Sequence, residues 1–163
     1  MMQIPTVQDW GPVRDDDVWA RKVYMGRSID DLHAHFLDNA VSAAEDLIEM
    51  REIPFRYYIY GFKNALESAA ADPYCEYPPE MAMSSIFFVL EHTLRYDSAK
   101  IWPILDEWLE IAKNLYESLA DPDEESFGTA SYRLRWKEII RLKQLAEKHA
   151  LEAKKQPKKP ICD

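Results

Sequence analysis

The chain has 163 residues, of which 47% are hydrophobic and 12% aromatic, so it is long and apolar enough for one domain with a sizeable core. Its formal net charge of -9 at pH 7 disfavours nucleic acid as the main partner, because phosphate would be repelled by most of the surface. The longest apolar run, residues 86–90, falls far short of the roughly 18 residues that a membrane span needs.

The sequence also argues against several kinds of chemistry. The four glycines lie far apart, so no glycine-rich loop can cradle a phosphate, and no GxSxG motif marks a nucleophilic serine. The two cysteines, Cys75 and Cys162, match neither a CxxC motif nor a disulfide framework, and the first residues lack a basic stretch followed by an apolar one. We therefore expect a cytoplasmic protein without a cofactor or a bound metal.

Hydrophobic residues recur with helical spacing along most of the chain. We predict long helices over the residue ranges 28–52, 54–71, 79–96, 100–120 and 129–155, with a short additional helix compatible with residues 15–24. Ser28 is a good N-cap for the first, Pro54 separates the first from the second, and Pro103 is tolerated in the first turn of the fourth.

These elements predict an all-α protein and no strand. Short connections between long helices favour antiparallel neighbours, hence a single-domain bundle of about five helices, mostly up-and-down. The domain would span residues 1–155, with a short N-terminal extension and a flexible basic tail at 156–163. The helix at 79–96 is apolar almost all round, which is typical of a helix at the centre of a domain or in a subunit interface. An alternative is that Met83, Phe87 and Phe88 line an apolar ligand pocket.

Two histidines in the first long helix point in different directions on a helical wheel. His33 falls on the apolar face, so we expect a buried or interhelical histidine. Asp31, His35 and Asp38 fall on the polar face with spacing that permits shared metal coordination. No ExxH pair recurs on another helix, as a carboxylate-bridged metal bundle would require. A metal-assisted hydrolase is therefore kept as an alternative, and a solvated or partner-facing acidic stripe is favoured.

This acidic stripe, with two tyrosines of the next helix, is the predicted partner-binding surface. Tyrosines beside carboxylates offer apolar area with a polar tip, which protein-binding hot spots use. Alternatively, the N-terminal segment with Trp10 and Trp19 covers these tyrosines. The predicted surface comprises Asp31, His35, Asp38, Glu45, Asp46, Glu49, Tyr57 and Tyr60.

Charge is unevenly distributed along the chain. Residues 1–128 carry 10 Lys+Arg and 25 Asp+Glu, whereas residues 129–163 carry 10 Lys+Arg and 4 Asp+Glu. The basic residues of the last helix form a stripe that either is solvated, pairs with the acidic body, or contacts nucleic acid together with the tail. The stripe consists of Arg133, Lys137, Arg141, Gln144 and Lys148.

No motif identifies a family. Small size, acidity and an all-helical pattern are shared by many small bacterial immunity proteins, which is a likeness of general type. Our leading hypothesis is a non-catalytic binding protein of immunity or antitoxin type that neutralises a basic, nucleic-acid-acting protein. The alternatives are the hydrolase above and a ligand- or nucleic-acid-binding module that uses the last helix.

Overall fold

The computed structural model describes the backbone of residues 2–71, 79–119 and 127–155, and most side chains within these ranges. All regular structure in these ranges is helical, which confirms the all-α expectation. The elements are α1 (Val7–Trp10), α2 (Val18–Tyr24), η1 (Asp30–Leu32), α3 (His33–Asp38), α4 (Ala40–Glu49), α5 (Glu52–Ala71), α6 (Pro79–Tyr96), α7 (Ser98–Ile101), η2 (Trp102–Ile104), α8 (Leu105–Leu119) and α9 (Phe127–Lys155).

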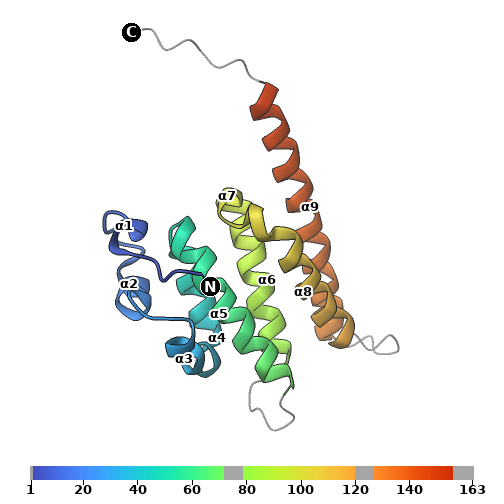
Figure 1. Cartoon of the computed structure of the whole chain (residues 1–163). Coiled ribbons are helices and arrows are strands. Elements are labelled where there is room, and N and C mark those ends of the chain that lie inside the picture. Colours follow the sequence, from blue (N-terminus) through green and yellow to red (C-terminus); the bar gives the residue numbers. More distant parts are fainter. Residues whose placement is uncertain (1, 72–78, 120–126, 156–163) are drawn as a thin grey trace.

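Helix α6 lies at the centre of the bundle, as its all-round apolar sequence predicts. It contacts α4, α5, α7, α8 and α9, and side chains on nearly every side of it are buried, among them Met83, Phe87 and Leu90. Its two most extensive neighbours, α4 and α9, run in the same direction as α6 (Figure 1). The simple antiparallel bundle of about five helices is therefore wrong in detail, because consecutive long helices alternate in direction but the main packing partners of α6 are parallel to it.

The first long helix that we expected is broken at Asn39. This residue has φ -152° and ψ 71°, outside the helical region, and its side-chain oxygen accepts a 3.1 Å hydrogen bond from the backbone N–H of Ser42. Asparagine competes with the helical backbone in this way, so it favours caps over helix interiors. The chain there consists of η1, α3 and a separate α4. The predicted N-cap at its start is confirmed, since Ser28 and Asp31 bond reciprocally.

The two histidines both lie in α3, before the break, and both are half-buried. His33 is therefore not fully buried in the core, and its expected place between helices stays a prediction. His35, expected on the wet face, places Nε2 3.1 Å from the buried hydroxyl of Tyr24. A 3₁₀ turn at Asp30–Leu32 advances by about 120° per residue instead of 100°, so one helical wheel cannot describe residues 28–47.

Helix α3 packs closely on α5 because Gly61 has no side chain. A Cβ there would lie 2.7 Å from Cε2 of Phe36 and 2.8 Å from Cγ2 of Ile29. Phe36 fills this space and also meets the ring of Phe62, with centroids 5.9 Å apart. The glycine thus lets the η1–α3 segment sit against the middle of α5 and fixes where α4 begins.

The N-terminal segment is fastened to the ends of α4 and α5 by arginines. Arg21 is buried, pairs with the fully buried Asp17 at 2.6 Å and donates to the carbonyl of Trp10. Arg14 donates to the carbonyl of Glu49. Trp10 is buried against Tyr58, with ring centroids 6.1 Å apart, so this segment belongs to the core.

The predicted fourth helix is also divided. Pro103 lies in η2, between α7 and α8, where a missing N–H costs no helical hydrogen bond. Before it, the buried Lys100 donates through Nζ to the carbonyl of Ile48 at 2.6 Å. A cation at the carboxyl end of a helix is favourable, so this contact ties α7 to the end of α4.

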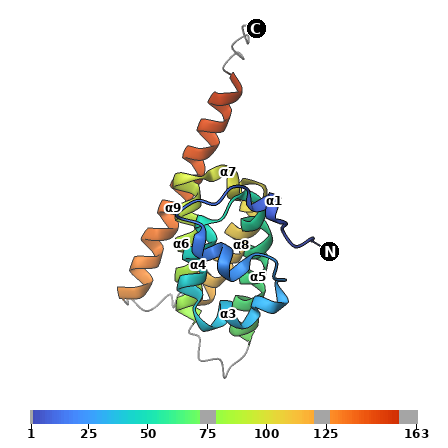
Figure 2. The same ribbon diagram turned by 90° about the vertical axis from the view of Figure 1, so that its left-hand side faces the viewer.

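Helix α9 extends beyond the rest of the bundle at its C-terminal end (Figures 1 and 2). Among the described helices, none is both long and apolar enough to cross a membrane. Several features named from the sequence lie outside the described residues: Cys75, Cys162 and the tail at 156–163.

Candidate protein-binding face

Four carboxylates lie on α3 and α4, and we call them the α4 acidic face: Asp38, Glu45, Asp46 and Glu49. Asp38 and Glu45 are exposed, and the other two are partly exposed. Helix α4 buries its opposite side through Ala40, Ala43, Ala44, Leu47 and Ile48. The face therefore follows from the spacing of small and apolar residues, which rotates the acidic side of α4 away from the core.

None of these four carboxylates forms an ion pair within the described part of the chain. Many acidic residues elsewhere do, mostly with a basic residue one helical turn away or on a neighbouring helix. These pairs include Glu52–Arg56, Glu67–Lys63, Glu107–Lys63, Glu117–Lys113, Asp106–Lys143, Glu91–Arg135 and Glu138–Arg141. On the α4 acidic face, Glu49 lies near Lys100 and His92 without forming a direct pair; burial lowers the pKa of both basic groups, and the charge of Glu49 partly offsets this.

Asp46 is the most constrained of the four. Its Oδ2 atom is buried without a hydrogen-bond partner. Burial, reinforced by the charge of Glu45, raises the pKa of Asp46 to about 6, and the nearby Tyr24 hydroxyl partly offsets this shift. Burial also raises the pKa of Tyr24 and lowers the pKa of His35, whose ring meets that hydroxyl. Burial thus disfavours the charged form of all three groups.

The predicted Asp31–His35–Asp38 constellation is not assembled as a metal site. Both carboxylate bonds that the structure records for Asp31 run to Ser28, and they lower the pKa of Asp31. His35 directs Nε2 towards Tyr24. Within the described residues, no three His, Cys, Asp or Glu side chains lie close enough to hold an ion. Asp31 forms a helix cap together with Ser28, and Asp38 belongs to the α4 acidic face.

The two tyrosines differ in their surroundings. Tyr57 is buried, with 8% of its surface exposed, and its ring meets Tyr58 edge-on. The expectation that it is an exposed contact residue is therefore wrong, but Trp19, which the alternative would bury over the tyrosines, is itself 59% exposed. Tyr60 is partly exposed, and its hydroxyl donates to Glu107 on α8 at 3.0 Å. The tyrosines thus lie apart from the α4 acidic face and help pack α5.

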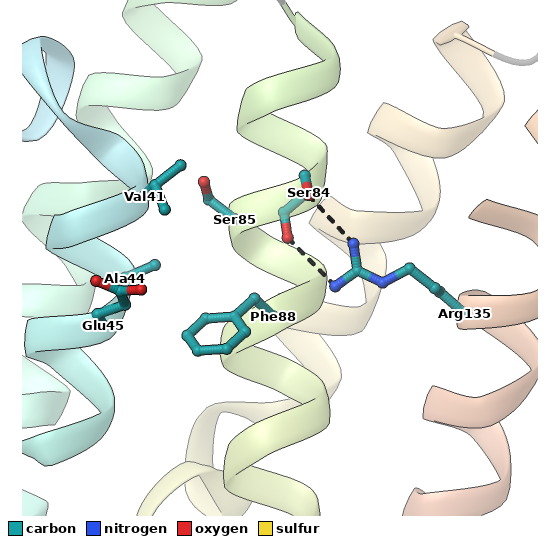
Figure 3. A pocket seen from close by; sticks show the side chains of 7 residues that line it. All are labelled: Val41, Ala44, Glu45, Ser84, Ser85, Phe88 and Arg135. Atoms are coloured by element: carbon teal, nitrogen blue, oxygen red, sulfur yellow. Dashed lines mark hydrogen bonds between the residues drawn. The ribbon is translucent and has the colours of Figure 1, made fainter. Parts of the chain in front are cut away.

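A pocket of about 170 Å³ adjoins the acidic face and was not expected from the sequence (Figure 3). It lies between α4 and α6, and Arg135 of α9 reaches it from the other side of α6. The hydroxyl of Ser85 is buried and has no hydrogen-bond partner in the structure. The sequence signal was the pair of serines within an otherwise apolar helix. The lining residues are Val41, Ala44, Glu45, Ser84, Ser85, Phe88 and Arg135.

The predicted basic stripe of α9 is exposed at all five positions. One of its members, Arg141, pairs with Glu138 in the same helix. The basic residues that reach other helices lie outside the stripe: Arg135 bonds both oxygens of Glu91 on α6, and Lys143 pairs with Asp106 on α8. Helix α9 therefore uses one basic side for packing and leaves another facing outward.

A comparison of the chain with known protein families, curated proteins and solved structures finds no match. The site is therefore interpreted from its own geometry and charge.

Proposed function

We propose that this chain is a non-catalytic binding protein that captures a basic protein through the α4 acidic face, in the manner of an immunity or antitoxin-type inhibitor. The observation that carries the proposal is the contrast in pairing. Most carboxylates on α5, α6 and α8 have basic partners, with the exposed Glu110 of α8 as an exception, whereas none of Asp38, Glu45, Asp46 and Glu49 forms an ion pair in the described chain. An acidic surface with unbalanced charge is complementary to a basic one.

The mechanism is electrostatic capture followed by occlusion. Like-signed charge gathered on one face steers an oppositely charged partner and raises its association rate by roughly 10- to 1000-fold, an effect that salt screens. Such a partner, if it acts on nucleic acid, exposes a basic cleft for phosphate, and α4 would cover that cleft. The rigidity of α4 supports this role, because Lys100 holds its carboxyl end and Asn39 caps its start.

The test is site-specific photo-cross-linking in the cells that naturally make the protein. A photoreactive residue replaces Val41, which is 47% exposed on α4, and, as a matched control, Lys113, whose side chain is 57% exposed on α8. We expect position 41 to cross-link a basic protein in a yield that falls as salt rises, and position 113 to cross-link none. The proposal is contradicted if no basic protein is captured at position 41, or if both positions capture the same proteins equally.

A second candidate rests on α9, whose C-terminal end projects from the bundle with the basic stripe exposed (Figure 2). Lys and Arg side chains on one helical face can contact phosphates. A mobility-shift assay at low salt decides between the two. Binding of nucleic acid that is lost in the double substitution Arg133→Gln, Lys137→Gln would favour this candidate over capture of a basic protein.

A further inference from the structure

The Ser85 hydroxyl is a buried polar group without a partner. Ser85 is 3% exposed, and its Oγ atom has no hydrogen-bond partner. Leaving a buried polar group unpaired is unfavourable, so most such groups are hydrogen-bonded. This hydroxyl lines the pocket between α4 and α6, beside Val41 and Ser84 (Figure 3).

The size of the pocket limits what can enter it. Its volume is about 170 Å³. Sites for metabolites and cofactors span roughly 300–1,000 Å³, so this pocket is too small for most of them. It suits a single side chain, which is how an anchor residue of a partner protein occupies a surface.

The charges around the pocket favour a cation. Two charged residues line it, Glu45 and Arg135. The guanidinium of Arg135 is already matched, because it bonds both carboxylate oxygens of Glu91 at 3.1 and 3.0 Å. Glu45 has no such match in the described chain, and Asp46 and Glu49 lie on the same helix. Of the two lining charges, Glu45 is therefore the one without an ion-pair partner in the described chain.

The polar atoms of the lining favour an ammonium group over a guanidinium. The Ser84 hydroxyl is turned towards Arg135 and accepts from it at 3.2 Å, so a second cation bound there would meet the guanidinium (Figure 3). The acceptors left for a ligand are the Ser85 hydroxyl and the Glu45 carboxylate. An ammonium carries three N–H donors, and a guanidinium, with five, would leave more of them unmatched.

The remaining lining matches an aliphatic stem. Val41, Ala44 and the ring of Phe88 supply apolar surface on both helices. Lysine buries its methylene chain against such surface while its charged end keeps polar contacts, and an aromatic face also attracts a cation.

We infer that the pocket between α4 and α6 receives a lysine side chain of the basic partner, held by Glu45 and Ser85. This inference rests on the proposed function and adds the anchor residue that the partner must present. It assigns Ser85 a role in recognition, since the free protein gives its hydroxyl no partner.

The first test uses lysine blocked at both ends, Nα-acetyl-lysine N-methylamide, titrated into ¹⁵N-labelled protein up to tens of millimolar. We expect the backbone amides of Val41, Ser84, Ser85 and Phe88 to shift in a saturable manner. The same compound with its side-chain amine acetylated is expected to bind at least tenfold more weakly. Absence of these shifts, equal binding of the acetylated compound, or tighter binding of the free diamine putrescine would overturn the inference.

The second test uses variants with matched controls. Glu45→Gln and Ser85→Ala are each expected to weaken lysine binding about tenfold, as loss of one hydrogen bond to a charged group predicts. The controls Glu110→Gln and Ser42→Ala are expected to leave it unchanged. A merely structural Ser85 would lower the melting temperature when replaced, whereas we expect Ser85→Ala to leave it unchanged or raise it. Normal lysine binding by Ser85→Ala would overturn the inference.

The two proposals fail in different ways. If position 41 cross-links a basic protein but blocked lysine does not bind, the pocket inference fails and the proposed function stands. If blocked lysine binds but position 41 captures no basic protein, the proposed function fails, and the pocket then recognises an ammonium group from another source.

Discussion

Carboxylates occur both on the α4 acidic face and on the charged surface between α6 and α9, but their surroundings differ. Between α6 and α9, charges meet across the helices: Arg135 bonds Glu91, and Arg95 bonds Glu138 at 3.1 Å. On the α4 acidic face, the carboxylates of Glu45 and Glu49 form no ion pair within the described chain. Charged side chains therefore hold helices together between α6 and α9, whereas on α4 we propose that they bind a partner.

The reason lies in what each helix buries. Helix α4 packs through a continuous apolar side, so its position does not depend on its charges. Helix α9 has few fully buried side chains among those described, namely Ile139, Leu142 and Ala146. Cross-helix ion pairs fix the rotation and register of such a helix. Substitutions that remove the ion pairs of α9 should therefore destabilise the fold more than substitutions on the α4 acidic face.

The largest loss of stability is expected from Arg135→Met. The substitution keeps the stem but removes the hydrogen bonds to Glu91 and Ser84, and it leaves Glu91, with 21% of its side chain exposed, uncompensated. We expect the free energy of unfolding to fall by about 1–3 kcal/mol. Denaturant unfolding measures it. The exposed neighbour Arg133→Met is the control, with an expected change below about 0.5 kcal/mol. Equal effects of the two substitutions would show that the network does not hold α9.

The acidic face responds to pH through Asp46. Because burial raises the pKa of Asp46 to about 6, the folded protein prefers the protonated carboxyl. Below pH 4 the carboxyl is protonated in the folded and the unfolded chain, so it does not lower the free energy of unfolding. As pH rises through 6 the buried carboxyl must ionise, and the free energy of unfolding falls. Since the residue is half-buried, solvent screening reduces the effect to about 1 kcal/mol.

Asp46→Asn removes this cost. We expect the variant to be more stable than the parent protein by about 1 kcal/mol at pH 8, with the gap closing by pH 4. Thermal or denaturant unfolding across this range measures the difference. A gap that is constant with pH, or one that widens towards acid, would mean that Asp46 is not the titrating group.

A smaller effect is expected when the exposed part of the acidic face is reversed. Asp38→Lys, Glu45→Lys and Glu49→Lys should each change the free energy of unfolding by no more than about 0.5 kcal/mol, because none forms an ion pair in the described chain. Circular dichroism and unfolding of the triple variant test this. A loss of several kcal/mol would show that these carboxylates stabilise the fold, and the contrast between the two regions would then disappear.

The sequence predicts the central helix well and the first helix poorly, for physical reasons. Pro79 at the start and apolar residues all round leave few alternatives for residues 79–96, and the observed α6 spans the same residues. The break at Asn39 depends on one side chain reaching the N–H of Ser42, a local competition that apolar spacing does not reveal. The break would have been predicted if Asn39 had been interpreted as an N-cap residue that binds the N–H of Ser42, three residues later.

The candidate site was predicted in part. The acidic residues of α4 could be placed on a polar face from spacing, and Asp38 and Glu45 are exposed as expected. The burial of Tyr57 depends on how other elements pack against α5, and the pocket at Ser85 depends on how α4 and α6 pack. Such contacts join residues far apart in sequence, so helical periodicity within one element cannot supply them.

The most direct measurement compares two charge reversals with the same change in net charge. One is the triple variant of Asp38, Glu45 and Glu49, and the other replaces Asp106, Glu110 and Glu117 of α8 with lysine. Each is titrated, at low and high salt, against the basic protein captured through position 41. We predict that the α4 variant raises Kd at least about thirtyfold at low salt, mostly through slower association, and that the α8 variant changes it less than about threefold. An equal loss in both variants would contradict the account, because binding would then follow net charge and not the α4 acidic face.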